Sequence, residues 1–123
     1  MATESGDIHR LGGGSLENLR LKPVEMNLDP PGISVLKAPS ARKAVMQMWE
    51  VFPKADLLHE KARVVGTTSI ERIRSVGFEV IPKPTRKLPN HYRIIHPQDV
   101  AGFNDANLMK LSEVFVNTSD HKI

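Results

Sequence analysis

The chain has 123 residues, of which 40% are hydrophobic and 25% charged, values typical of one folded domain that exclude a wholly disordered or collagen-like chain. It has no cysteine, which excludes disulfides, cysteine-bound metal sites and thiol nucleophiles together. The formal net charge is only +3, but residues 72–96 carry one acidic side chain, Glu79, against the basic Arg72, Arg74, Lys83, Arg86, Lys87 and Arg93.

A loose polar tail is expected over residues 1–7, followed by a short strand over residues 8–11. The tail lacks the basic and apolar regions of a cleavable secretory signal, and no apolar run reaches the roughly 18 residues of a membrane-spanning helix. A protein that stays in the cytoplasm, or is exported without a cleavable signal, is therefore expected, with no membrane partner. The glycines after the strand, Gly12 to Gly14, predict a flexible turn.

The segment after these glycines begins ambiguously, since residues 16–21 fit either a short strand or a helical turn. Three prolines predict an extended, irregular connection over residues 22–31. A strand is expected over residues 32–36, where β-branched side chains alternate with other residues. The first third of the chain thus predicts two short strands joined by an irregular segment.

Two helices are predicted in the middle of the chain. Ser40 is suited to cap a helix over residues 41–52, whose apolar side chains repeat at helical spacing and place Trp49 in the core. A second helix is expected over residues 54–64, with Gly66 as its C-terminal stop. The apolar stripe of the helix over residues 41–52 is typical of a buried face, so Trp49 and the methionines are interpreted as core residues and not as a cofactor site.

A further helix is expected over residues 70–76, because Thr68 and Glu71 have the spacing of a capping box. Residues 78–81 predict a strand. The loop over residues 82–89 contains three prolines and is expected to be stiff. This loop carries much of the basic charge and leads into the next strand.

The C-terminal part predicts a strand over residues 91–95 and a helix over residues 105–115 that is capped by Asn104. Residues 117–123 are expected to fray. Together the elements predict a single small α+β domain over residues 8–116, with short strands and three to four helices.

The segment around residues 91–97 carries the strongest candidates for chemistry. Alternate residues of a strand share a face, so His91 and Arg93 are expected to point the same way, near Arg86 of the basic loop. This combination is suited to bind a phosphate or to stabilise a developing anion. His91 and His96 would also suit a metal-independent ribonuclease, one as base and one as acid. No metal-ligand spacing accompanies them, so no metal is expected.

The order of the short motifs resembles a known family. Arg10 lies on the first expected strand, Pro31-Gly32-Ile33-Ser34-Val35 follows, and Pro89-Asn90-His91-Tyr92-Arg93-Ile94-Ile95-His96-Pro97 precedes the last helix. This order is similar to that of the small ADP-ribosyltransferase-like toxin domains of bacterial secretion and polymorphic toxin systems. The resemblance spans about residues 8–115 and implies a reduced form of the split sheet of that family.

The resemblance implies an NAD-dependent transferase that modifies a macromolecular target and has a cognate immunity protein as a partner. The cofactor-binding residues that it implies are Arg10, Ser34 and Arg93. The catalytic residues that it implies are His91, Arg10 and Glu79. No Glu-x-Glu or Gln-x-Glu pair lies near a late strand, so Glu79 and Glu113 are the candidates for the carboxylate.

Two other classes of function remain open in the sequence. A ribonuclease-type toxin would use His91, His96 and the basic loop to bind nucleic acid, without a dinucleotide. A non-enzymatic immunity or adaptor protein would need an exposed apolar patch, with Met46, Met48 and Met109 as candidates. The motif order favours a bacterial toxin or effector enzyme over both alternatives.

Overall fold

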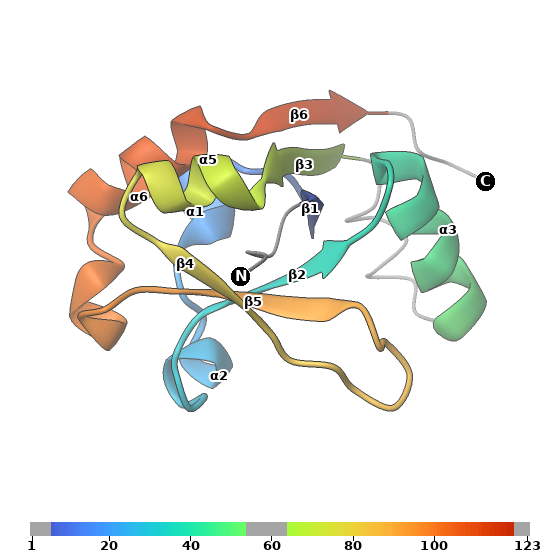
Figure 1. Cartoon of the computed structure of the whole chain (residues 1–123), viewed down its shortest axis with the longest axis horizontal. Coiled ribbons are helices and arrows are strands. Elements are labelled where there is room, and N and C mark those ends of the chain that lie inside the picture. Colours follow the sequence, from blue (N-terminus) through green and yellow to red (C-terminus); the bar gives the residue numbers. More distant parts are fainter. Residues whose placement is uncertain (1–5, 54–63, 120–123) are drawn as a thin grey trace, which may run out of the picture.

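The computed structural model describes residues 6–53 and 64–119, and it has the α+β fold that the sequence predicts. Six antiparallel strands form one sheet in the order β4-β5-β2-β1-β3-β6 (Figure 1). The strands are β1 (Asp7–Leu11), β2 (Ile33–Lys37), β3 (Val64–Ser69), β4 (Glu79–Pro82), β5 (His91–Ile95) and β6 (Val116–Ser119). The four strands that the sequence predicts are confirmed as β1, β2, β4 and β5.

Helices and turns join these strands. Within the described ranges they are α1 (Leu16–Leu19), α2 (Pro23–Met26), α3 (Ala41–Val51), α5 (Ile70–Ser75), the 3-10 helix η1 (Asp99–Gly102) and α6 (Asp105–Glu113). The predictions of α3, α5 and α6 are confirmed, and α1 resolves the ambiguity of residues 16–21 as a helical turn. The helix expected over residues 54–64 lies outside the described residues, except for Val64, which begins β3.

The main core lies on the face of the sheet that α1, α5 and α6 cover. Its central residues come from strands and helices alike and are fully buried: Ile8, Leu19, Ile33, Ile70, Ile73, Ile94, Leu108 and Leu111. Ser40 and Asn104 cap α3 and α6 as predicted, each accepting a hydrogen bond from a backbone amide in the first turn. These caps and the apolar faces explain why both helices can be predicted from the sequence.

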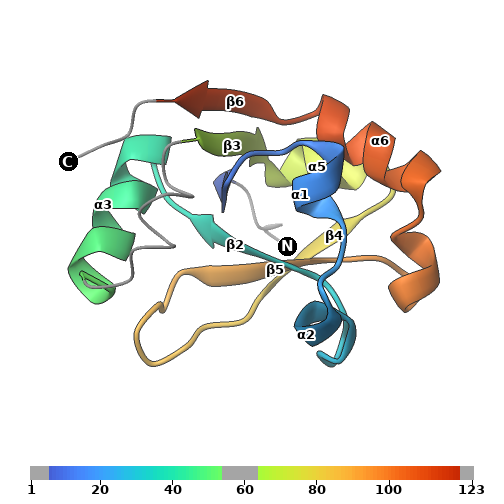
Figure 2. The same ribbon diagram turned by 180° about the vertical axis from the view of Figure 1, so that it is seen from behind.

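A smaller apolar cluster lies on the opposite face, beneath α3. Met48 of α3 packs with Leu36 of β2 and with Leu88 of the loop between β4 and β5. Trp49 is partly buried and packs at the edge of a small cluster of Val45 and Val65, so the prediction that it belongs to the core is confirmed only in part. The sheet therefore has apolar packing on both faces, with α3 at one end of the molecule and α5 and α6 at the other in both views (Figure 1, Figure 2).

The glycine turn after β1 is closely packed, contrary to the prediction of a flexible turn. Gly12 donates from its amide to Val64 O at 2.8 Å, and Gly14 donates to Asn117 Oδ1 at the same distance. A Cβ atom on Gly66 would lie 2.5 Å from the nitrogen of Gly14. The prediction that Gly66 ends a helix is wrong, because Gly66 lies inside β3 and lets the turn approach the strand.

Three other predictions are corrected. The connection over residues 22–31 contains the single turn α2, whose Pro23 stands at the first helical position, where the missing amide costs nothing. The cap of α5 is Ser69 rather than Thr68, and it accepts from the amide of Arg72. Residues 116–119 form β6, so the part of the predicted frayed tail that the structure describes pairs with β3.

The N-terminal limit of the predicted domain also moves. Asp7, predicted in the loose tail, is the first residue of β1 and pairs with Ser69. Among the described residues no helix has the length and hydropathy to cross a membrane.

Candidate functional site

The strands β1 and β2 pair over only part of their length. Ile8 pairs with Lys37 and His9 with Leu36, whereas all of β1 from Asp7 to Leu11 pairs with β3 on its other side. Over residues 33–35 the backbone of β2 therefore has no strand partner toward β1. A strand in this position presents amide and carbonyl groups that need other partners if they are buried.

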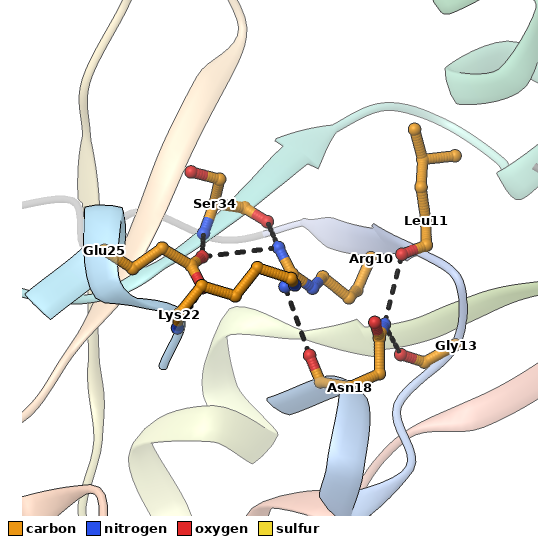
Figure 3. A network of polar contacts seen from close by, with 7 residues as sticks. All are labelled: Arg10, Leu11, Gly13, Asn18, Lys22, Glu25 and Ser34. Carbon is orange, nitrogen blue, oxygen red and sulfur yellow. Dashed lines mark hydrogen bonds and ion pairs between the residues drawn. The ribbon is translucent and has the colours of Figure 1, made fainter. Parts of the chain in front are cut away.

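Two buried side chains supply these partners at Ser34 (Figure 3). Arg10 donates from Nη1 to the carbonyl oxygen of Ser34 at 2.8 Å, and Glu25 Oε2 accepts from the amide of Ser34 at 3.4 Å. The guanidinium and the carboxylate also form an ion pair, with Nη1 and Oε2 3.6 Å apart. Arg10 and Glu25 thus supply the hydrogen bonds that a neighbouring strand would otherwise make with Ser34.

Neighbouring contacts hold both side chains in place. Arg10 Nη2 donates to the backbone oxygen of Asn18 at 3.1 Å, and the amide side chain of Asn18 in turn donates to Leu11 O and Gly13 O. Glu25 Oε1 accepts from the amide of Lys22 at 3.0 Å. The turn after β1 and the helical turn α2 therefore position the pair from two sides.

Burial dominates the electrostatics of Arg10. Only 8% of the residue is exposed, and Glu25 is 5% exposed. Burial lowers the pKa of Arg10 below its ordinary value, and the negative charge of Glu25 acts in the opposite direction. The Nε of Arg10 is buried and has no hydrogen-bond partner in the described structure. One donor of the guanidinium therefore stays unsatisfied beside the cavity described next.

A cavity of about 400 Å³ lies at the place where β1 and β2 separate. Much of its wall is apolar and comes from α3, β2 and the loop before β5: Met48, Phe52, Leu36 and Leu88. The polar and charged residues of its lining are His9, Arg10, Lys22, Glu25, Ser34 and His91. Three of the residues that the sequence singled out, Arg10, Ser34 and His91, are thus brought together around one cavity.

His91 reaches this cavity from β5. Its backbone pairs with Leu36, which pairs in turn with His9, so the three side chains share one face of the sheet. His91 Nδ1 lies 2.9 Å from the carbonyl oxygen of Lys83, which makes Nδ1 the protonated nitrogen and leaves Nε2 without a hydrogen-bond partner in the described structure. A neutral His91 therefore has a free acceptor nitrogen.

His9 is placed differently, although it lines the same cavity. It is almost fully buried, with Nδ1 2.9 Å from Thr67 Oγ1 and Nε2 2.9 Å from Ala38 O. Both ring nitrogens are thus committed to the protein. His9 is better placed to hold β1 against β3 and the end of β2 than to act on a ligand.

The other predicted site residues lie elsewhere. Arg93 lies beside Ser34 in the register of β2 and β5, but it donates to Pro30 O at 3.0 Å and does not line the cavity. Glu79 lies on β4 and binds Arg74, with Oε1 and Nε 2.6 Å apart. Glu113 is exposed at the end of α6. Neither Glu79 nor Glu113 lines the cavity.

The second histidine of the nuclease hypothesis is also separate from the first. His96 packs edge-on against Phe78 of the main core at a ring-centroid distance of 4.9 Å, and its Nδ1 accepts from the amide of Gln98. His91 lines the cavity on the α3 face of the sheet. The two histidines therefore do not face a common site.

Sequence reasoning missed Glu25 and Lys22. Both lie in the proline-rich connection that is expected to be irregular, and neither belongs to a recognisable motif. Glu25 becomes the carboxylate of the site because α2 turns it toward Arg10, a contact that no local pattern encodes. Comparison of the chain with family models, curated proteins and solved structures gives no match.

Proposed function

We propose that the protein is a toxin or effector enzyme that resembles ADP-ribosyltransferases and uses NAD to modify a macromolecular target. The observation that supports this proposal is that Arg10, Ser34 and His91 line one cavity. These are the residues for which the motif order implies roles around NAD. Their separation in the chain makes this convergence more informative than any of the motifs alone.

The residues of the cavity fit one half of a dinucleotide. A volume of about 400 Å³ is at the lower end of the range for small-molecule sites, which is suited to a nicotinamide ring and its ribose rather than to the whole of NAD. Leu36, Met48 and Phe52 offer apolar surface for the ring. Arg10 and Ser34 line the cavity, and the hydroxyl of Ser34 suits an oxygen atom of the ligand.

Glu25 is the carboxylate in this site, in place of Glu79. Bound NAD would supply a glycosidic bond whose cleavage develops positive charge on the ribose. A preorganised carboxylate in a low-dielectric site stabilises such charge strongly. Arg10 and the amides of Lys22 and Ser34 hold the side chain of Glu25 in a fixed position. Arg10 therefore orients the carboxylate as well as lining the site.

His91 has the geometry of a proton acceptor. The carbonyl oxygen of Lys83 fixes the proton on Nδ1, so Nε2 carries the lone pair in the neutral form. Histidine is the side chain most often used for general acid–base catalysis. In the proposed reaction His91 accepts a proton from the attacking group of the target or from water.

The proposal is tested by release of nicotinamide from NAD, which needs no knowledge of the target, and by transfer of labelled ADP-ribose to components of a bacterial lysate. Glu25→Gln and His91→Ala are each expected to lower the rate by about 100-fold, in the range found for charge-stabilising and acid–base groups. Glu79→Gln and His96→Ala are the matched controls, and they are expected to retain most of the activity.

Equal losses in the site variants and the controls would contradict this site, and so would a wild-type protein that neither cleaves NAD nor binds it. Growth arrest on expression in bacteria, relieved by His91→Ala and retained with His96→Ala, would support a toxin. Degradation of RNA that depends on both histidines would instead support the nuclease, which the separation of His91 and His96 disfavours.

The non-enzymatic alternative has little support from the surface. Met48 is 7% exposed and belongs to the core under α3, so it cannot contribute to an apolar patch. Met46 and Met109 are 37% and 55% exposed, but they lie on α3 and α6 at opposite ends of the molecule (Figure 1, Figure 2). The three methionines therefore do not form one docking surface.

A further inference from the structure

The loop between β4 and β5 presents three cations that have no acidic partner in the described part of the chain. Arg86 and Lys87 are exposed and Lys83 is half-buried. The sequence has no aspartate or glutamate between Glu79 and Asp99. In the described structure none of the three cations forms an ion pair with a carboxylate. Among the described residues, 6–53 and 64–119, no carboxylate therefore neutralises the positive charge of this loop.

Hydrogen bonds fix the backbone of the loop, so the points from which its cations extend are defined. The amide of Thr85 donates to Leu88 O at 3.0 Å, and Thr85 Oγ1 accepts from the amide of Leu88 at 2.9 Å. The amide of Lys83 donates to His91 O at 2.9 Å, while the carbonyl of Lys83 holds the ring of His91. The prolines of the loop stiffen it further. Binding an anion here would therefore order side chains but not the loop backbone.

The same loop borders the cavity. Leu88 lines the cavity next to Phe52 and His91. Lys87 lies with its Nζ 5.3 Å from the ring centroid of Phe52, a cation–π contact that holds the ammonium at the rim. Both views place the loop on the same side of the molecule as α3 (Figure 1, Figure 2). A ligand that fills the cavity and extends past Phe52 would meet Lys87, the neighbour of Arg86 in this loop.

We propose that Lys83, Arg86 and Lys87 form a phosphate-binding rim of the cavity, so that the small-molecule substrate is a phosphorylated nucleoside or dinucleotide whose base and ribose lie inside. This inference rests on the proposed function, because the cavity holds only part of NAD. Arg86 provides a forked donor for phosphate oxygens and Lys87 a point charge. The rim thus accounts for the portion of the ligand that the cavity leaves outside.

The test compares two probes that differ by one phosphate, nicotinamide mononucleotide and nicotinamide riboside, with pyrophosphate as a third probe. Affinities are measured by calorimetry at low salt for the wild type and for R86E/K87E. The double variant is expected to bind the mononucleotide and pyrophosphate about tenfold more weakly, as two exposed charge reversals allow, and to bind the riboside unchanged. The matched control is R72E/K110E. It changes the net charge by the same amount as R86E/K87E, but at one residue of α5 and one of α6.

Each result separates the rim from the catalytic proposal. Binding of pyrophosphate that R86E/K87E weakens, with no binding of the riboside, supports the rim and contradicts the proposed function. Binding of both nicotinamide probes without any effect of R86E/K87E overturns the rim and leaves the proposed function standing. An equal loss in R72E/K110E would show a general charge effect and overturn the rim. The rim would also be overturned if R86E/K87E weakened the binding of an RNA oligonucleotide but of none of the small-molecule probes, because the loop would then bind a nucleic acid.

Discussion

Arg10 and Glu25 bind the two ends of one residue, Ser34: the arginine donates to its carbonyl oxygen at 2.8 Å and the glutamate accepts from its amide at 3.4 Å. Side chains, rather than a strand, therefore close this edge of β2. The strands can separate without leaving the amide and the carbonyl of Ser34 unpaired, and the cavity lies where they separate. The ion pair is thus both part of the site and the reason that the site is open.

The stability of the fold is expected to depend on this pair. Removing Arg10 with Arg10→Met leaves the buried Glu25 without its cation and should lower the free energy of unfolding by about 3–5 kcal/mol. Glu25→Gln should cost less, because the amide oxygen can still accept from Ser34. Denaturant unfolding of the two single variants and the double variant measures the coupling, which should exceed about 1 kcal/mol. Additive losses would show that the two side chains act independently.

The glycine turn gives a second prediction about stability. Gly66→Ala should destabilise the protein by about 2 kcal/mol or more, because its Cβ would lie 2.5 Å from the nitrogen of Gly14 and the turn would have to move. Gly77→Ala is the control. Gly77 has φ +92°, and a methyl group there would meet no atom within 4 Å, so only backbone strain of about 1 kcal/mol is expected. Thermal unfolding should therefore rank Gly66→Ala below Gly77→Ala.

Elements with a strong local pattern could be predicted from the sequence, and elements set by tertiary pairing could not. α3 and α6 combine a cap with an apolar face, so their ends were predicted nearly correctly. β3 was missed because Gly66 resembles a helix stop, although its role is to admit the turn after β1. β6 could not be predicted because all four of its residues are exposed and only Val116 is apolar, so the segment has no alternating pattern. Its structure comes from pairing with β3.

The candidate site divides in the same way. Arg10, Ser34 and His91 could be selected because each stands on a strand that the sequence reveals. Glu25 could not, because its role comes from the packing of α2 against the gap between β1 and β2. Glu79 is a candidate only because the sequence has no Glu-x-Glu or Gln-x-Glu pair near a late strand, and the basic residues around it explain why it binds Arg74 instead.

The pair of Glu79 and Arg74 predicts a pH dependence. Burial acts to raise the pKa of Glu79, but hydrogen bonds from the Val80 amide and from Arg74 outweigh it, so the pKa lies below its ordinary value of 4.5. The stabilisation is therefore complete above that value and is lost as the pH falls through the lower pKa of the folded state. Its size should stay below about 1 kcal/mol, because both side chains are partly exposed. Glu79→Gln should flatten the stability profile below pH 4.5, and an unchanged profile would contradict this origin.

Two adjacent threonines of β3 should respond in opposite directions to the same substitution. Thr68 is 4% exposed, and its Oγ1 is buried with no hydrogen-bond partner in the described structure. Thr68→Val removes this unsatisfied hydroxyl, keeps the shape and suits a strand, so it should raise the free energy of unfolding by about 1 kcal/mol. Thr67 Oγ1 instead lies 2.9 Å from Nδ1 of the buried His9. Thr67→Val removes this hydrogen bond from the buried His9 and should lower stability by about 1–3 kcal/mol. Denaturant unfolding of the two variants decides the matter, since a loss of stability in Thr68→Val would mean that its hydroxyl has a partner in solution.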